Sequence, residues 1–167
     1  MHPPIGILEV LVHRWNLPIA ALAILLTTAA CGGGGRSSRP SGAPPPPGMV
    51  AATQPAAAVE QFLGLAQQQR YTEMGYVFGT ARGSLAERRD PASVARRMQA
   101  LANVLRHDSF AMTGVVPAAG RAEARVVTVQ LRQGRRTANV PFTVVEGPGG
   151  RWFVEVVDVE AATASPR

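Results

Sequence analysis

The sequence predicts an α+β domain, with two to three N-terminal helices packed on one face of a four-stranded antiparallel, curved sheet. Three observations predict this class. Apolar residues recur at helical spacing between positions 55 and 106, they alternate at strand spacing after position 107, and turn residues separate the alternating runs. Helices followed by strands are typical of folds in which the two kinds of element are segregated.

The first helix is expected over residues 55–70. Its apolar residues share one face at spacing i, i+3, i+4, i+7: Val59, Phe62, Leu63 and Ala66. Pro55 suits the first helical turn. A short second helix follows, with Thr72 as its expected cap. The Gly-containing stretch 79–84 is expected to be a loop.

The third helix has the sharpest start signal in the chain. Asp90 can accept hydrogen bonds from free N–H groups of the first turn, and Pro91 is preset for the first helical position. The helix is expected to run to about Arg106. Its buried stripe is predicted to contain Val94, Met98, Leu101, Ala102 and Leu105.

Four strands are expected after His107. Alternation predicts them over 109–116, 121–132, about 138–144 and 152–160, with a hairpin turn at Gln133–Gly134. Pro141 cannot donate to a strand ladder, which predicts an edge strand or a bulge for the third of them. The fourth has apolar residues on both faces, which predicts a central strand.

The charge of the chain shows no nucleic-acid footprint. The net charge is +6, and all 17 basic residues are arginine. A nucleic-acid surface needs basic residues clustered on one face with stacking aromatics among them. Here the arginines are spread along the sequence and aromatic content is 5%. We therefore expect no nucleic-acid partner and interpret most arginines as solvated surface.

Residues 1–30 resemble the signal peptide of a bacterial lipoprotein. A ten-residue apolar run, 17–26, is followed by Thr28-Ala-Ala-Cys31, which is similar to a lipobox with Thr28 in place of the usual Leu. The run is shorter than the roughly 20 residues that a membrane span needs. The resemblance implies a lipid on Cys31, the only cysteine, and a protein anchored to membrane lipid in the cell envelope, with its domain in the periplasm or outside the cell. Ordinary cleavage that leaves a free cysteine is the alternative.

The remaining chain divides by composition. Residues 31–54, rich in Gly, Ser and Pro, are expected to be a flexible linker behind the lipidated cysteine. The domain is expected over 55–160. A frayed tail is expected over 161–167.

The element order resembles the nuclear transport factor 2-like, or cystatin-like, superfamily. The shared features are the Ala-Val-x-x-Phe-Leu pattern of 58–63, two further helices, and hairpinned strands that end in Trp-Phe-Val-Glu-Val-Val at 152–157. The family's usual strand pair before the last long helix has no counterpart in this pattern. The resemblance implies a cone-shaped fold and, in many relatives, a homodimer through the sheet. Small lipoproteins of uncharacterised function are common in the family, which also includes isomerases and hydrolases with an Asp or His in the pocket.

Five residues are candidates for such a pocket: Tyr71, Tyr76, His107, Trp152 and Asp158. His107 or a buried Asp158 could act as a general base. The plainer alternatives are a histidine at a helix C-terminus, an aspartate at a strand end in solvent, and aromatics in the core. The residue pattern predicts no metal site, no cofactor and no catalytic constellation.

Three functions remain open. The first is a non-enzymatic envelope lipoprotein that binds a small apolar ligand or docks on another envelope protein. The second is a pocket enzyme of the ketosteroid isomerase or polyketide cyclase kind. The third is a structural module that assembles as a homodimer through the sheet.

Overall fold

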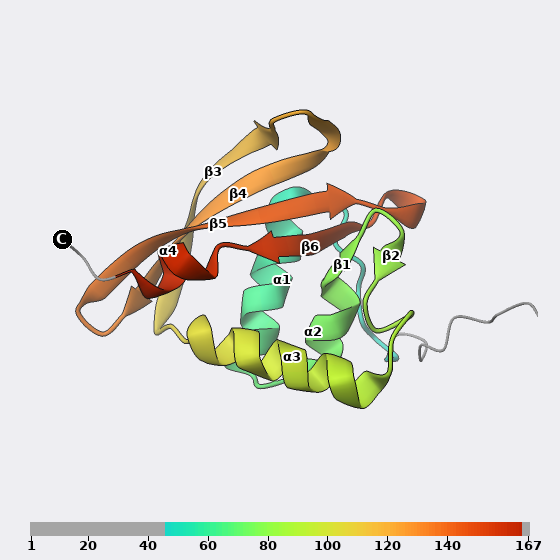
Figure 1. Ribbon diagram of the computed structural model, residues 1–167, viewed down its shortest axis with the longest axis horizontal. Coiled ribbons are helices and arrows are strands. Elements are labelled where there is room, and N and C mark those ends of the chain that lie inside the picture. Colours follow the sequence, from blue (N-terminus) through green and yellow to red (C-terminus); the bar gives the residue numbers. More distant parts are fainter. Residues whose placement is uncertain (1–45, 165–167) are drawn as a thin grey trace, which may run out of the picture. The chain divides into compact units, whose positions relative to one another are not determined.

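The structure is a computed structural model that describes residues 46–164. Cys31 and the segment predicted as a signal peptide lie outside the described residues. The elements, in order, are α1 (Pro55–Gln67), α2 (Tyr71–Val77), β1 (Gly79–Thr80), β2 (Gly83–Ser84), α3 (Pro91–Val104), β3 (Ser109–Ala118), β4 (Arg121–Gln133), β5 (Arg136–Glu146), the 3₁₀ turn η1 (Pro148–Gly150), β6 (Trp152–Val157) and α4 (Val159–Thr163). The domain is α+β with a four-stranded antiparallel sheet, as predicted (Figure 1).

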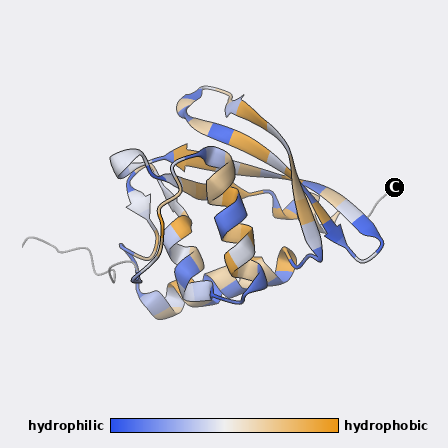
Figure 2. Ribbon diagram, turned by 180° about the vertical axis from the view of Figure 1, so that it is seen from behind, coloured by the Kyte–Doolittle hydropathy of each residue, from blue (hydrophilic) through white to orange (hydrophobic). Residues whose placement is uncertain are grey.

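The sheet is a simple meander in the order β3-β4-β5-β6. The predicted turn between β4 and β5 is confirmed, and Gly134 there has φ +61°, a left-handed conformation that glycine adopts without strain. Figure 2 shows that this hairpin end is hydrophilic, whereas hydrophobic residues continue along the strands behind it.

The strand order corrects two predictions. β5 was expected to be an edge strand or to lie at a bulge because of Pro141. It is not an edge strand, since it lies between β4 and β6, but its pairing with β6 shifts register between Thr143 and Val144. The Pro141 carbonyl accepts a hydrogen bond from the Asp158 N–H at 3.0 Å, so it points toward β6. The nitrogen of the same residue points the same way. At this position β6 has already ended, at Val157. The missing N–H therefore leaves no gap in the ladder.

β6 was expected to be central and is an edge strand of this sheet. The outer edge of β6 is nevertheless covered. Phe78, just after α2, forms an isolated parallel bridge with Val154, so the outer edge of β6 is covered by residues from the helical half of the chain. Both Phe78 and Val154 are buried.

The helices form largely as their patterns predict. The expected stripe of α1 is buried, and the Asp90 carboxylate accepts a hydrogen bond from the Ser93 N–H at 2.8 Å at the start of α3. The predicted cap of α2 is wrong, because the position before this helix is Arg70 and no side chain caps it.

Large side chains from helices and strands fill the space between them. Phe62 of α1 lies with its ring centre 6.5 Å from that of Phe142 in β5, in an edge-to-face arrangement. Both are fully buried, as are Met98 of α3 and Leu131 of β4. The interior of the domain is therefore a packed core.

Residues 79–84, expected to be a loop, form the β1–β2 hairpin. The missed signal is steric. A Cβ atom at Gly79 would lie 2.5 Å from the Gly83 carbonyl oxygen, so only glycine allows this close approach.

The predicted tail contains a short helix. The Asp158 carboxylate accepts a hydrogen bond from the Ala161 N–H at 2.8 Å and caps α4. Ala162 is 1% exposed, and the Arg136 guanidinium donates to its carbonyl at 2.8 Å. The last helix therefore belongs to the domain, and the boundary predicted at residue 160 is too early.

The last part of the predicted linker also contacts the domain. In this lead-in segment (residues 46–54), Met49 and Ala52 pack on the core. The Trp152 N–H donates to the Ala52 carbonyl at 2.8 Å, and the Gln61 side chain donates to the Val50 carbonyl at 3.0 Å. The chain is thus fixed to the domain before α1 begins.

Candidate functional site

The structure places the five candidate pocket residues in three separate locations. Tyr76 and Trp152 line a small cavity under the lead-in segment. Tyr71 and His107 line a groove beside the ends of α1 and α3. Asp158 is exposed at the junction of β6 and α4. The single pocket that the family resemblance implied is not formed by these residues.

The cavity at Tyr76 and Trp152 is small and mostly apolar. Its volume is about 50 Å³, whereas sites for small organic ligands are typically about 300–1,000 Å³. Burial raises the pKa of the Tyr76 phenol, and the nearby Glu87 and Glu73 carboxylates raise it further. The cavity can hold water or a very small group, but not a ligand of cofactor size.

The groove at His107 is larger, about 490 Å³, and its lining is mainly polar: Ala66, Gln67, Gln69, Tyr71, Ala102, Asn103, Leu105, Arg106 and His107. Gln69 has φ +56°, which is uncommon for a residue with a side chain. Hydrogen-bonding groups from the two helix ends thus converge here without a nucleophile or a carboxylate among them.

His107 itself is 9% exposed. Its Nδ1 lies 2.7 Å from the Leu105 carbonyl oxygen, and because a carbonyl only accepts, Nδ1 carries the hydrogen. In the neutral ring the lone pair is then on Nε2, which is buried and has no hydrogen-bond partner among the described residues. Phe110 lies edge-on to the imidazole, with 5.4 Å between ring centres. Because Nε2 is inaccessible to solvent, it is not placed to take a proton from a molecule in the groove.

Asp158 contacts the backbone of α4 and does not line a pocket with the other candidate residues. Its carboxylate caps α4, and the residue is exposed. The carboxylate thus lies in solvent and is engaged with a backbone N–H, and it is not enclosed in an apolar pocket. The general-base hypothesis for Asp158 gains no support from this geometry.

A polar site that the sequence analysis missed joins the β1–β2 hairpin to β6. Ser84 and Glu87 form a reciprocal capping box, with the Glu87 N–H donating to the Ser84 hydroxyl at 3.2 Å and the Ser84 N–H donating to the Glu87 carboxylate at 3.3 Å. Arg151 donates two hydrogen bonds to the same carboxylate, at 3.2 and 3.3 Å. The sequence signal that indicates this site is the Ser-x-x-Glu spacing of residues 84–87.

Competing effects set the charge state of Glu87. Burial by itself would raise the pKa of its carboxyl group, but hydrogen bonds from Arg151 and Ser84 and the charge of Arg151 outweigh it and lower the pKa. The carboxylate is therefore ionised and engaged within the fold.

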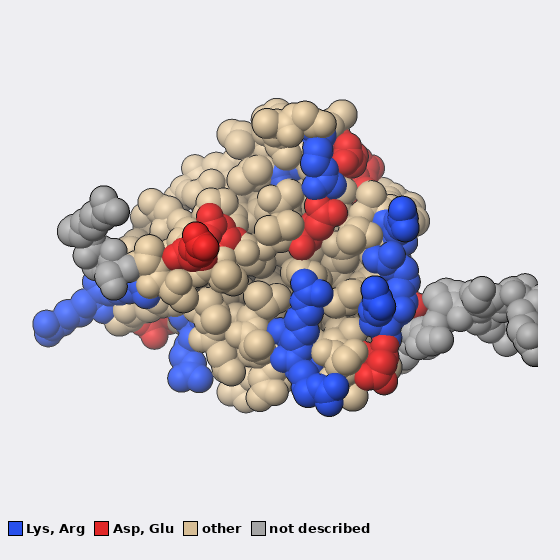
Figure 3. Space-filling model, viewed as in Figure 1, with Lys and Arg blue, Asp and Glu red and all other residues tan. Residues whose placement is uncertain are grey.

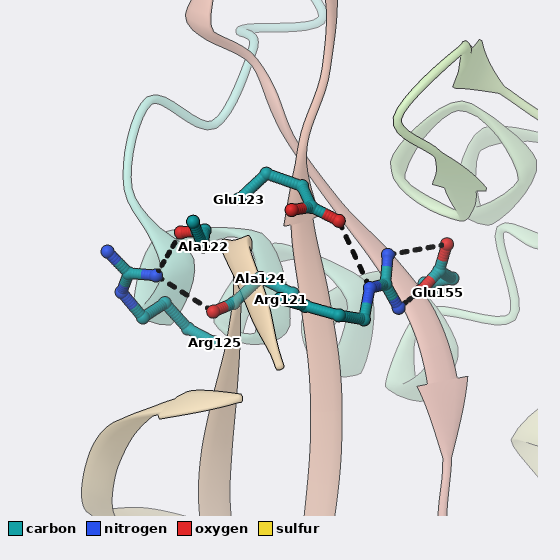
Figure 4. Close-up of polar contacts among 6 residues, drawn as sticks. All are labelled: Arg121, Ala122, Glu123, Ala124, Arg125 and Glu155. Atoms are coloured by element: carbon teal, nitrogen blue, oxygen red, sulfur yellow. Dashed lines mark hydrogen bonds and ion pairs between the residues drawn. The ribbon is translucent and has the colours of Figure 1, made fainter. Parts of the chain in front are cut away.

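A second ion-pair group ties the start of β4 to β6. Figure 4 shows Arg121 between Glu155 and Glu123, while Arg125 turns the other way and donates to the carbonyls of Ala122 and Ala124. The hydrogen bonds that Arg121 donates to the carboxylates of Glu155 and Glu123 raise the pKa of its guanidinium group. This cluster joins two strands that are not neighbours in the sheet.

The sheet face that points away from the core carries an exposed apolar row. Cross-strand pairing places Val116, Val126, Thr143 and Val156 side by side over all four strands, and we call these four residues the outer row. Val127, next to Val126, is 0% exposed in the core, so the outer row lies on the opposite face. Val116 and Val156 are 55% and 53% exposed.

On one side, the row next to the outer row contains Gly114, Thr128 and Pro141. It continues to the exposed Asp158, whose N–H donates to the Pro141 carbonyl, so one carboxylate lies beside the outer row. On the other side, Phe153 is already covered, since the Arg151 guanidinium lies 5.0 Å from its ring centre. The most exposed apolar side chains of the outer row are therefore Val116 and Val156 on the edge strands β3 and β6, with half-buried Val126 and Thr143 between them.

Within residues 46–164, no group of three or more His, Cys, Asp or Glu residues is placed to hold a metal ion. None of the helices in that part of the chain has the length and hydropathy to cross a membrane. No protein-family model, curated protein or solved structure matches this chain.

Proposed function

We propose that this protein is a non-enzymatic lipoprotein of the bacterial cell envelope, anchored through acylated Cys31, whose domain docks on another envelope protein. The export-signal pattern of residues 1–31 supports the anchor. The outer row supports the docking, because it runs across all four strands of one sheet face and leaves the apolar side chains of Val116 and Val156 about half exposed.

We extend the proposal to a nuclear transport factor 2-like domain, with the first three helices on one face of a curved sheet. Contacts of α1 with β4, β5 and β6 support it. So does the β1–β2 hairpin, which stands directly before α3, where the family usually has a strand pair. In this chain the cone is filled by side chains such as Phe62 and Phe142, which favours a surface function over a ligand pocket.

Site-specific photocrosslinking in intact envelopes tests the docking. A photoreactive amino acid at Val156, in the outer row, is expected to give a discrete adduct with one other protein. The control is Glu60, an exposed residue of α1, where no such adduct is expected. Equal labelling at both positions, or none at Val156, would contradict a docking role for this face.

A second copy of the chain is the alternative occupant. The outer row spans the whole sheet, so two copies related by a two-fold axis could cover each other's valines. Sedimentation equilibrium of the wild-type protein and of the Val116→Arg, Val156→Arg double variant separates the two occupants. A dimer that the double variant abolishes identifies the second copy, and a wild-type monomer at high concentration assigns the face to a different protein.

The anchor has its own test. Mass spectrometry of the protein extracted from membranes is expected to show a chain that begins at residue 31 and carries acyl groups. Cys31→Ser is expected to lose the acyl mass, whereas Ser38→Ala, seven residues further on, keeps it. A wild-type chain without acyl mass would refute the anchor and leave the docking proposal to the crosslinking result.

A further inference from the structure

The whole net charge of the described domain lies in one stretch. Residues 46–164 contain thirteen arginines and ten acidic residues. Five of these arginines but only two of the acidic residues lie in residues 82–97, and the rest of the described chain is balanced at eight of each. The spread of arginines along the sequence therefore concealed a local excess of positive charge.

The fold gathers this excess at one end of the domain. Residues 82–97 run from the tip of the β1–β2 hairpin into the first turns of α3, and we call this region the basic end. Figure 3 shows basic side chains grouped over α3 and the hairpin, with few acidic ones between them.

Both acidic residues of the basic end are engaged within the fold. Glu87 is bound by Arg151, and Asp90 caps α3. Glu87 is therefore compensated by an arginine outside the basic end, whereas the exposed Asp90 still contributes one negative charge to this surface.

Two of the five arginines have internal contacts. Arg88 donates to the Thr80 hydroxyl at 3.0 Å, and the Arg97 guanidinium lies 5.1 Å from the centre of the Phe78 ring. The other three are Arg82, Arg89 and Arg96, which are exposed and form no ion pair with any described residue. Three uncompensated guanidinium groups thus face solvent.

The chain enters the domain on the same side. The start of the lead-in segment lies on the side of the molecule where α3 begins, and the β3–β4 hairpin rises on the far side of the domain from α3 (Figure 1). Pro46, the first described residue, lines a groove with Gln68, Arg70 and Glu73. Fourteen residues separate Cys31 from Pro46, so even a fully extended chain spans only about 50 Å. A lipid on Cys31 would keep the basic end close to the membrane.

We infer that the basic end docks on anionic phospholipid headgroups of the membrane that holds Cys31, an inference that rests on the proposed anchor. Guanidinium groups bind phosphate in a bidentate manner. Each arginine at such a surface strengthens the attraction by about fivefold, and the effect fades within a Debye length. Docking by this end turns the β3–β4 hairpin away from the membrane and leaves the outer row accessible to a protein partner.

Site-specific fluorescence quenching tests the docking. The full-length membrane-extracted protein carries a fluorophore at Ala92→Cys, an exposed position in α3, or at Ala119→Cys, in the β3–β4 turn. It is mixed with vesicles that contain headgroup-nitroxide lipid. One set is phosphatidylcholine alone, and the other also contains phosphatidylglycerol. We expect quenching at position 92 only with phosphatidylglycerol, and little quenching at position 119 in either set.

Two triple variants with equal charge change make the test specific. Arg82, Arg89 and Arg96 replaced together by Gln are expected to abolish the quenching at position 92. Arg106, Arg132 and Arg135, which are exposed outside the basic end, serve as the matched control, and their replacement by Gln is expected to preserve it. High salt is expected to weaken the signal because it screens the attraction.

The outcomes separate the two proposals. Quenching that is equal in both vesicle types, or equal in the two triple variants, would overturn the docking and assign the basic end to solvent or to an acidic protein. Mass spectrometry of the same sample reports the acyl groups on Cys31. If they are absent, the anchor fails, while quenching at position 92 that requires anionic lipid still supports the basic end as a lipid-binding surface.

Discussion

At the scale of single residues, two glycines in helices have opposite roles. A Cβ atom at Gly75 in α2 would lie 2.3 Å from a methyl carbon of Val94 in α3, so the two helices approach closely only because the side chain is absent. A Cβ atom at Gly64 in α1 meets no atom within 4 Å. Replacement of each glycine by alanine therefore separates the effect of helix packing on stability from the effect of helix propensity.

Gly75→Ala is expected to lower the free energy of unfolding by roughly 1–3 kcal/mol, because overpacking forces the helices apart. Gly64→Ala is expected to raise it by about 0.5–1 kcal/mol, because alanine has the higher helix propensity. Urea unfolding followed by circular dichroism measures both. A Gly75→Ala protein as stable as the wild type would show that α2 and α3 can separate without cost.

The lowered pKa of Glu87 makes part of the stability dependent on pH. A carboxyl group whose pKa is lower in the folded than in the unfolded protein stabilises the fold above its unfolded value, here the ordinary 4.5, and this contribution is lost as the pH falls through the folded value. Glu87→Gln is expected to be less stable than the wild type at pH 7, and the difference is expected to shrink below about pH 4.5.

Thermal unfolding at a series of pH values tests this prediction. Glu60→Gln serves as the control, because Glu60 is an exposed glutamate on α1. The Glu60→Gln protein is expected to be about as stable as the wild type at pH 7. A Glu87→Gln difference that stays constant down to pH 3 would mean that Arg151 and Ser84 do not favour the ionised form.

At the scale of elements, the two aspartate caps support helices of different importance. α3 has 14 residues and buries Val94 and Met98 in the core, whereas α4 has 5 residues near the end of the chain. Asp90→Ala is expected to lower the free energy of global unfolding by about 1 kcal/mol. Asp158→Ala is expected to speed amide hydrogen exchange in residues 159–163 with little change in the global value. Similar global losses in both variants would show that α4 unfolds together with the core.

Elements whose signals lie in neighbouring residues were predicted from the sequence. The stripe of α1, the Asp90 cap and the Gly134 turn depend on residues a few positions apart, and each is found in the structure. The general character of the strands followed from alternation in the same way.

Features that depend on distant residues were not predicted. The edge position of β6 was hidden because Phe78, more than seventy residues earlier, covers it. The lead-in segment is fixed by Gln61 and Trp152, and α4 by Arg136. The five candidate residues do not share one pocket for the same reason. Periodicity indicates that an aromatic side chain is buried, but it does not indicate which residues surround it.

At the scale of the whole molecule, the lead-in segment can be detached in principle without disturbing the core. We predict that Met49→Asp combined with Ala52→Asp shifts the fluorescence of Trp152 to longer wavelength, because solvent reaches the ring, while the unfolding midpoint changes little. Val50→Asp is the control, since Val50 is 78% exposed. Trp152 emission that is unchanged in the double variant would contradict the contact.

The attachment of the lead-in segment also determines how the domain bears mechanical load. A pull on the chain from the side of Pro46 reaches the Val50 and Ala52 carbonyls first, and each is held by a single hydrogen bond, so they give way one after the other at low force. Detachment of the lead-in segment adds its nine residues to the extended chain before any force acts on α1. The sheet remains folded during this step. The lead-in segment thus detaches at a lower force than the folded domain and limits the force that reaches α1.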